Sequence, residues 1–341
     1  MDIKEIGELR LIQRIADNYG SSHASIVSGI GEDAAALKIS EHTLLLTTCD
    51  LLLEDVHFNL DLTTSYQLGK KSLAVNLSDI AAMGGTPRFF LVSLALPPHL
   101  SVEFIDDLYR GMTDLAHEFD TQLVGGDTNA SPDKLIIDIT LLGEAHPEYL
   151  LKRSGAQVGD SIFVTGTLGD AALGFFILEF DQNMNRSYSH NTLTYRHLSP
   201  YPRIKEGRSI AEHQLASSMI DISDGLLIDL QRILTLSKLG ATISIPQLPL
   251  SKEFKQYQGQ LRHNKIDFAL RGGEDYELLF TSPHTKEEEL FKLSHTLGFS
   301  INKIGEVNPS EELLILDQNQ KPYIIDDHGY DHFSSSYKLD C

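Results

Sequence analysis

The sequence predicts an α/β protein, with its helices and sheets layered as an α+β sandwich, built in two halves. The chain has 341 residues, more than the ~250–300 at which a single hydrophobic core stops growing. Apolar runs typical of strands alternate with segments of helical periodicity along both halves. A polar stretch at 146–160 interrupts this alternation. We therefore expect one domain over 1–148 and a second over 149–341.

In the first half, a helix is expected over 1–20, and strands are expected at 34–39 and 43–53. Residues 65–84 carry apolar side chains at helical spacing and end at two glycines, which predicts a long buried helix. A strand at 88–97 and an amphipathic helix at 101–119 follow. Residues 121–145 are predicted to form a strand, a glycine turn at 125–126 and another strand.

The second half begins with a predicted strand, glycine-rich turn and helix over 161–180. The turn at 166–169 is either a plain strand–helix connection or a cradle for an anion. Residues 181–197 are polar and lack periodicity, which predicts a loop. A strand leading into a helix is expected at 217–234, and further strands are expected within 241–250 and 268–282.

The charge balance argues against two classes of partner. The chain carries 48 acidic and 28 basic residues, for a net charge of −20, whereas a nucleic-acid binder needs a basic surplus. No apolar run reaches the ~18 residues of a membrane span, and the charged first 16 residues do not resemble a signal peptide. The two cysteines, Cys49 and Cys341, cannot form a disulfide framework. We expect a cytoplasmic protein that binds neither nucleic acid nor membrane.

A carboxylate recurs where an apolar strand or helix ends, beside Gly, Ser or Thr. Each such residue could be a cap or turn former, because Asp and Ser are favoured there. Asp79 fits that explanation least, because it lies within an apolar helix, where an unpaired carboxylate costs several kcal/mol. Oxygen ligands without paired His or Cys indicate Mg²⁺. The six places are Gly31–Asp33, Thr47–Asp50, Asn76–Asp79, Gly125–Thr128, Asp221–Gly225 and Gly272–Asp275.

Two segments match part of a phosphate-binding motif but lack the structural context that the motif requires. Gly29–Ala34 matches G-x-G-x-x-A, but a predicted strand, not a helix, follows it, and two carboxylates would face the pyrophosphate. Gly69–Ser72 has the end of a P-loop without its upstream glycine. The protein-kinase motifs HRD and DFG and the G-x-S-x-G elbow are absent from the sequence.

Several longer motifs occur in a fixed order between residues 29 and 333. They are GIGEDAA, TTCDLLLEDVHF, KSLAVNLSDIAAMGGTPRFFLVSLALP, LVGGDT, KRSGAQVGD, IDISDGLLIDL, LRGGEDYELLF and GYDHF. In these motifs the chain resembles thiamine-monophosphate kinases, which belong to the superfamily of aminoimidazole ribonucleotide synthetase. The resemblance implies that superfamily's two-domain fold, with the N-terminal sheets of two subunits paired into a barrel, and therefore a homodimer.

The same resemblance implies an activity and a set of site residues. The activity is ATP- and Mg²⁺-dependent, in-line phosphorylation of thiamine monophosphate to thiamine diphosphate, in thiamine diphosphate biosynthesis. No side chain is assigned as a general base, because the acceptor phosphate, with a second pKa of ~6, is mostly ionised at pH 7. Implied magnesium ligands are Asp33, Thr48, Cys49, Asp50, Asp79, Asp127, Asp221 and Asp224; ATP contacts are Tyr109, Gly126, Asp127, Arg153 and Ser223; thiamine-side contacts are His57, Glu274 and Tyr330, with Phe333 as the alternative aromatic.

Cys49 departs from the family pattern, which has Thr or Ser there. If the residue binds metal through its backbone carbonyl, little changes; if through a hydroxyl, one ligand is lost. Other members of the superfamily fit less well. Selenophosphate synthetases carry a reactive Cys before their metal motifs, hydrogenase-maturation dehydratases end in Pro-Arg-x-Cys, and the purine-pathway synthetase lacks GGEDYEL and GYDHF. A non-catalytic nucleotide or thiamine diphosphate binder is the alternative from another class.

Overall fold

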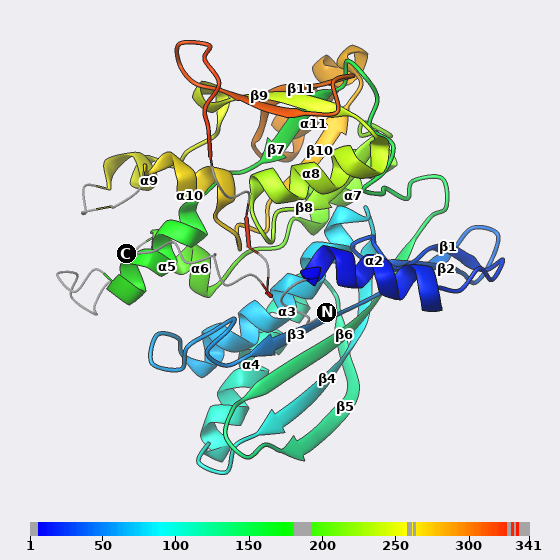
Figure 1. Ribbon diagram of the computed structural model, residues 1–341. Helices are drawn as coiled ribbons and strands as arrows, with labels where there is room; N and C mark the ends of the chain where they lie inside the picture. The colour runs from blue at the N-terminus through cyan, green and yellow to red at the C-terminus, as the bar shows by residue number, and fades with distance from the viewer. Residues whose placement is uncertain are drawn as a thin grey trace.

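The computed structural model describes residues 6–180, 192–257, 261, 264–325, 329–330 and 332–333. Within them the chain forms two six-stranded mixed sheets, one in each half, which confirms the predicted two-part α/β architecture. The first half lies below the second in Figure 1. The first sheet contains the strands up to Ala145 and the second those from Ser161 onward. The exact division at 148/149 stays a prediction.

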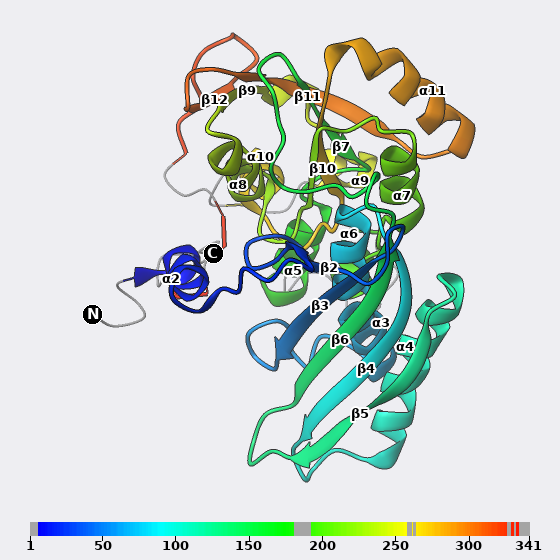
Figure 2. The ribbon, with the colours of Figure 1, turned by 90° about the vertical axis from the view of Figure 1, so that its right-hand side faces the viewer.

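The first sheet has the strand order β1-β2-β3-β6-β4-β5, and all its neighbouring strands are antiparallel except β4 and β5. Helices α3 (Ser65–Ala82) and α4 (Val102–Glu118) lie together on one side of it, as Figure 2 shows. The strands are β1 (Ile26–Ser28), β2 (Ala35–Lys38), β3 (Leu44–Leu53), β4 (Thr86–Leu96), β5 (Gln122–Ala130) and β6 (Ile136–Ala145).

Helix α3 forms because its ends are well defined and most of its surface is apolar. Thr64 and Gln67 make a reciprocal capping box at the N-terminus, which satisfies backbone groups that the first turn leaves unpaired. At the other end Gly84 takes φ +68°, a conformation that glycine adopts without strain. The helix crosses α4 closely: a Cβ on Gly69 or Gly111 would overlap backbone of the opposite helix. This packing fixes α3 firmly on the first sheet.

The second sheet has the strand order β12-β9-β11-β7-β10-β8. Its strands are β7 (Ser161–Thr165), β8 (Ser218–Asp221), β9 (Gly240–Ser244), β10 (Leu278–Ser282), β11 (Ile301–Asn308) and β12 (Leu313–Leu316). The remaining helices are α2 (Glu8–Tyr19), α5 (Asp170–Phe180), α6 (Thr192–Leu198), α7 (Ile204–Glu212), α8 (Leu226–Ser237), α9 (Lys252–Gln256), α10 (Ile266–Arg271) and α11 (Glu287–Leu297), with short 3₁₀ turns at Ile245–Gln247 and His284–Lys286.

The two halves share one hydrophobic core. Side chains from α3 and the first sheet pack in the same cluster as Tyr276, Leu278 and Phe280 of the second half, while a second cluster is made wholly of residues from the second half. Helix α3 touches α7 and β8 directly. It is therefore buried on nearly every side, and its Ser78 reaches across the junction of the two halves to Asp221.

Three local predictions were wrong. Gly125 and Gly126 are inside β5 rather than in a turn, because a Cβ on Gly126 would overlap the backbone of Val92 in β4. Residues 192–197 belong to α6, and residues 268–271 to α10, where a loop and a strand were expected. Residues 181–191 of the predicted loop lie outside the described part of the chain.

The turn at 166–169 is a strand–helix connection whose donors are already used. Asp275 accepts hydrogen bonds from the backbone N–H groups of Gly169 (2.6 Å) and Ala171 (3.2 Å) at the start of α5. Asp275 is thus a cap rather than a ligand, as its turn position also allowed. Separately, the described helices include none with the length and apolar character required to cross a membrane.

Candidate active site

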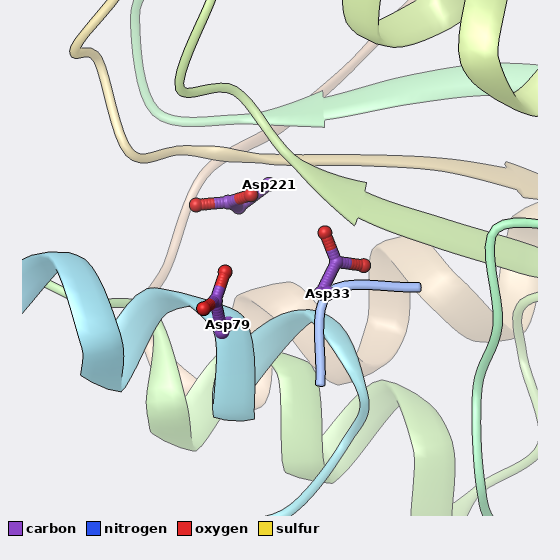
Figure 3. Close-up of side chains that lie close together, drawn as sticks. All are labelled: Asp33, Asp79 and Asp221. Atoms are coloured by element: carbon purple, nitrogen blue, oxygen red, sulfur yellow. The ribbon is translucent and has the colours of Figure 1, made fainter. Parts of the chain in front are cut away.

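Three aspartates from distant parts of the sequence meet at the junction of the halves. Asp33 lies in the loop before β2, Asp79 projects from α3 and Asp221 ends β8. One carboxylate oxygen from each lies within 4.8 Å of the other two, and Figure 3 shows the side chains converging. The first half supplies two of these groups and the second half supplies the third. We call Asp33, Asp79 and Asp221 the aspartate cluster.

Neighbouring hydroxyls hold two members of the cluster in place. Ser78 Oγ donates to Asp221 Oδ2 at 2.6 Å, and Thr48 Oγ1 donates to Asp79 Oδ2. Asp33 Oδ1 instead accepts from Arg153, but its Oδ2 is buried without a hydrogen-bond partner. A buried carboxylate oxygen left in this way costs free energy unless a cation meets it.

The electrostatics of the cluster match a site built for a cation. Burial raises the pKa values of Asp79 and Asp221 well above their usual range, and the neighbouring carboxylates raise them further. Burial, followed by Asp224, Asp138 and Asp33, raises the pKa of Asp50 to about 6. Carboxylate oxygens this close suit a hard ion such as Mg²⁺, which binds oxygen at ~2.0–2.1 Å.

Arg153 lies against Asp33. Its Nη2 and Nε donate to Asp33 Oδ1 at 2.7 and 3.1 Å, and Nη1 donates to the carbonyl of Gly31 at 3.2 Å. The Arg153 backbone N–H donates to Glu32 Oε2 at 2.8 Å. These bonds fix the connector between the two sheets to the loop that carries Asp33. The guanidinium is therefore a fixed cation at the edge of the aspartate cluster.

Asp224 sits in a second, adjacent arrangement. Arg232 Nη2 lies 2.7 Å from Asp224 Oδ2, and Arg232 Nη1 donates to Asp229 at 2.5 Å. Asp229 also accepts the backbone N–H groups of Asp224 and Gly225, each at 3.1 Å. These hydrogen bonds from Asp224 and Gly225 to Asp229 hold the turn before α8 in place. The sequence pattern had pointed to Asp224, but not to Arg232 or Asp229, which support it.

Some expected site residues lie elsewhere in the chain. Asp127 is exposed on β5, where Asn129 Nδ2 donates to its Oδ2 at 2.6 Å. The pairing β3–β6–β4–β5 puts three strand spacings, roughly 14 Å in all, between Asp50 and Asp127. Gly126 shares that edge strand, and Tyr109 lies on α4. A single chain therefore leaves these three residues outside the aspartate cluster.

Cys49 is on the face of β3 opposite to Thr48 and Asp50. Successive side chains of a strand point to opposite faces, and Cys49 is exposed while Thr48 is buried. Its sulfur therefore does not point toward Asp79, although its backbone remains beside the cluster.

We expect Cys49→Ser to change little. Because the side chain points away from the aspartates, kcat and the Mg²⁺ concentration for half-maximal rate of the expected reaction should stay within about twofold of the values for the unmodified protein. Steady-state kinetics over a Mg²⁺ series checks this. A tenfold gain in apparent Mg²⁺ affinity would mean that a hydroxyl at this position reaches the metal.

The residues expected at the thiamine end lie close together. Glu274 has φ 68°, and its backbone N–H donates to Ser223 O at 2.8 Å. The His57 ring is 5.0 Å from that of His332, which is 4.8 Å from the ring of Tyr330. His57 and Tyr330 are thus joined through His332, which the sequence pattern did not single out. The pKa of His57 is lowered, and burial of the ring is the largest cause.

Comparisons with known proteins follow the same division of the chain. Residues 31–145 match the family model "AIR synthase related protein, N-terminal domain", and residues 157–316 match the corresponding C-terminal domain. The thiamine-monophosphate kinase of Bacillus subtilis (strain 168) is 38% identical over 314 residues, covering 91% of this chain and 95% of the relative. That of Escherichia coli (strain K12) is 37% identical over 329 residues, covering 96% and 99%. This chain belongs to the thiamine-monophosphate kinase family.

A solved structure of AaThiL complexed with AMPPCP and TMP is 34% identical, with a TM-score of 0.84 over 97% of this chain and 99% of that one. The thiamine-monophosphate kinase family therefore accounts for the two-domain fold as well as for the sequence motifs. Its members are phosphotransferases with a phosphate group as acceptor. That chemistry needs charge neutralisation more than a base, as the aspartate cluster suggests.

Proposed function

We propose that this enzyme transfers the γ-phosphoryl group of ATP to thiamine monophosphate, yielding thiamine diphosphate and ADP, in thiamine diphosphate biosynthesis. Family membership over nearly the full chain supports the reaction. The observation that carries the assignment is the aspartate cluster, with its unpartnered Asp33 oxygen, between the two halves. The AaThiL structure, solved with AMPPCP and TMP, supports the choice of both substrates.

Mg²⁺ would be held by the aspartate cluster, with Thr48, Asp50 and Asp224 around it. Bound there, the metal supplies positive charge between two anionic phosphates that otherwise repel each other. The protein's own part is to hold oxygens in fixed positions: Ser78 orients Asp221, and Thr48 orients Asp79. No side chain has to remove a proton from the acceptor, because a phosphate monoester is mostly ionised at pH 7.

Arg153 would bind a phosphate group of ATP. Its guanidinium is already fixed by Asp33 and Gly31, so it can offer N–H groups without further ordering. Ser223 lies in the turn that also carries Asp224 and would contact the same phosphates. The thiamine end would be bound by Glu274, as an anion for the cationic ring, and by the aromatic side chain of Tyr330, with His57 next to it.

The positions of Asp127, Gly126 and Tyr109 support a homodimer. Asp50 and Asp127 are both proposed magnesium ligands, yet they lie roughly 14 Å apart across the sheet. Exposed apolar side chains, among them Leu51, Phe89 and Val124, mark the first sheet as a surface that a second copy could cover. Paired sheets would form a barrel and bring Asp127 of one subunit to the cluster of the other.

Mixing two inactive variants tests the dimer. If Asp127 serves the partner's site, equimolar Asp79→Asn and Asp127→Asn chains, unfolded and refolded together, should regain about a quarter of the unmodified activity. Half of the dimers would then be mixed, and each would have one intact site of two. Mixtures as inactive as either variant alone, although light scattering shows dimers, would contradict the shared site.

The reaction itself is tested by incubating the purified protein with ATP, MgCl₂ and thiamine monophosphate. Chromatography should show thiamine diphosphate and ADP in equal amounts, and none without Mg²⁺. Two results would refute the assignment: turnover of an aminoimidazole precursor or of selenide in place of thiamine monophosphate, or tight ligand binding without any product.

A further inference from the structure

A buried lysine lies beside the thiamine end of the site and is not used by the metal centre. Lys71, on α3, is only 3% exposed. Its Nζ is 2.7 Å from Glu274 Oε1 and donates to the carbonyl of His57 at 3.3 Å. A lysine is rarely buried unless it is paired, since the desolvated ammonium group costs several kcal/mol. Lys71 therefore joins two residues that the proposed function assigns to substrate binding.

His197 contacts the other oxygen of the same carboxylate. Its Nδ1 lies 2.7 Å from Glu274 Oε2, although the ring is not aligned for a regular hydrogen bond. Burial, and then the nearby Lys71 charge, lowers the pKa of His197. The ring of Phe175 packs against the His197 ring, with 5.0 Å between the two ring centroids. Both Glu274 oxygens are thus in contact, one with the Lys71 ammonium group and one with the His197 ring.

The carboxylate is ionised and partly open to the site. Burial acts to raise the pKa of Glu274, but Lys71 and His197 outweigh it and hold the pKa well below its usual range. Its side chain remains 28% exposed, compared with 4% for that of Lys71. A carboxylate has about four lone-pair positions, so contacts with Lys71 and His197 leave some of them for a ligand.

Lys71 also links the two ends of the site through one rigid element. It precedes Asp79 by eight residues on α3, which separates them by about 12 Å along the helix axis. The backbone of Glu274 is held in place as well, because its N–H donates a hydrogen bond to the carbonyl of Ser223, the residue before Asp224. The spacing between metal group and carboxylate is therefore set by helix geometry rather than by a loop.

We propose that Lys71 and His197 are positioning residues that hold the carboxylate of Glu274 in one orientation toward the cationic ring of the substrate. The proposal rests on the proposed function and names the residues that orient Glu274 at the part of the site that binds the thiamine ring. Without Lys71, the Glu274 side chain loses its charged partner and its fixed direction. The phosphate end, served by the aspartate cluster, keeps all its contacts.

The test measures both substrates separately. Lys71→Gln should raise the KM for thiamine monophosphate about 30-fold, as expected when one partner of a buried charge pair is removed. The KM for ATP and kcat should stay within about threefold. Lys71→Arg, which keeps the charge, should recover part of the loss. Lys70→Gln is the matched control: it removes a charge from the preceding residue of α3, whose Nζ lies 3.9 Å from Glu118, and should leave both KM values unchanged.

His197 provides a second, independent readout. His197→Asn keeps a donor near Nδ1, whereas His197→Leu removes it, so only the leucine variant should raise the KM for thiamine monophosphate, by about tenfold. If Lys71→Gln does not fold, this pair decides the matter. The proposal is overturned if the KM for thiamine monophosphate is unchanged in folded variants, or if kcat and both KM values fall or rise together. Absence of thiamine diphosphate with the unmodified protein would instead refute the proposed function.

Discussion

Asp79→Asn should lower the rate of thiamine diphosphate formation by about 10³-fold or more, while raising the melting temperature of the metal-free protein. The rate falls because the cluster loses one of three charges that would hold the metal, and a metal contributes several kcal/mol to such a transition state. The stability rises because a neutral amide replaces a carboxylate whose pKa is raised by burial and by Asp50, Asp221 and Asp33.

The sign of the pH dependence follows from that raised pKa. A group protonated more readily in the folded state stabilises the protein at low pH and stops doing so as the pH rises through its folded pKa. The melting advantage of Asp79→Asn should therefore grow with pH, and adding Mg²⁺ should stabilise the unmodified protein but not the variant. Differential scanning fluorimetry across pH, with and without Mg²⁺, measures both. Glu288→Gln, at an exposed carboxylate on α11, is the control. Equal Mg²⁺ stabilisation of both proteins would disprove the role of Asp79.

Arg153→Met should lower activity by about 10²-fold and, in contrast to Asp79→Asn, lower the melting temperature of the metal-free protein. Arg153 makes two hydrogen bonds to a carboxylate of the aspartate cluster, and breaking such a buried pair costs about 3–5 kcal/mol. The activity should fall because the proposed contact of Arg153 with a phosphate of ATP would be lost. Mg²⁺ should restore part of the lost stability, because the metal would replace the positive charge beside Asp33.

Lys152→Met is the matched control for Arg153. It removes a positive charge from the preceding residue, whose Nζ donates to the carbonyl of Val27. Its melting temperature and rate should change little. If Arg153→Met were as stable as the Lys152 variant without metal, the guanidinium would not be compensating Asp33. If its KM for ATP were also unchanged, Arg153 would not contact the nucleotide.

The sequence predicts those parts of the site in which a charged residue stands among apolar neighbours. Asp79 sits in an apolar helix, and that conflict indicates a cation or a polar partner beside it. The pattern of Asp and Gly at the ends of elements was less reliable, because Asp can cap a helix as well as bind a ligand, and Gly can lie in a strand as well as in a turn. Asp275 follows the same turn motif, yet its oxygens cap α5. Gly126 looked like a turn former, but it lies in a strand because the neighbouring backbone leaves no room for a side chain.

Other features depend on tertiary contacts and leave no local signal. His197 lies in a polar stretch without periodicity, and only the packing of α6 brings it to Glu274. Lys71 is one of two adjacent lysines in a helix, and nothing in the sequence distinguishes the buried one from Lys70. The supporting pair of Asp229 and Arg232 was likewise hidden among ordinary helix residues.

The shared packing of α3 has a consequence for how this chain can be divided. Ser78 and Asp79 come from that helix, whereas Asp221 and Glu274 come from beyond Ser161, so neither half contains the whole of the proposed site. A chain cut between the sheets should bind Mg²⁺ only after its two pieces reassociate. Fusions or permutations that reposition one half by even a few ångströms would change the distance between donor phosphate and acceptor, and would therefore alter the rate before they alter the fold.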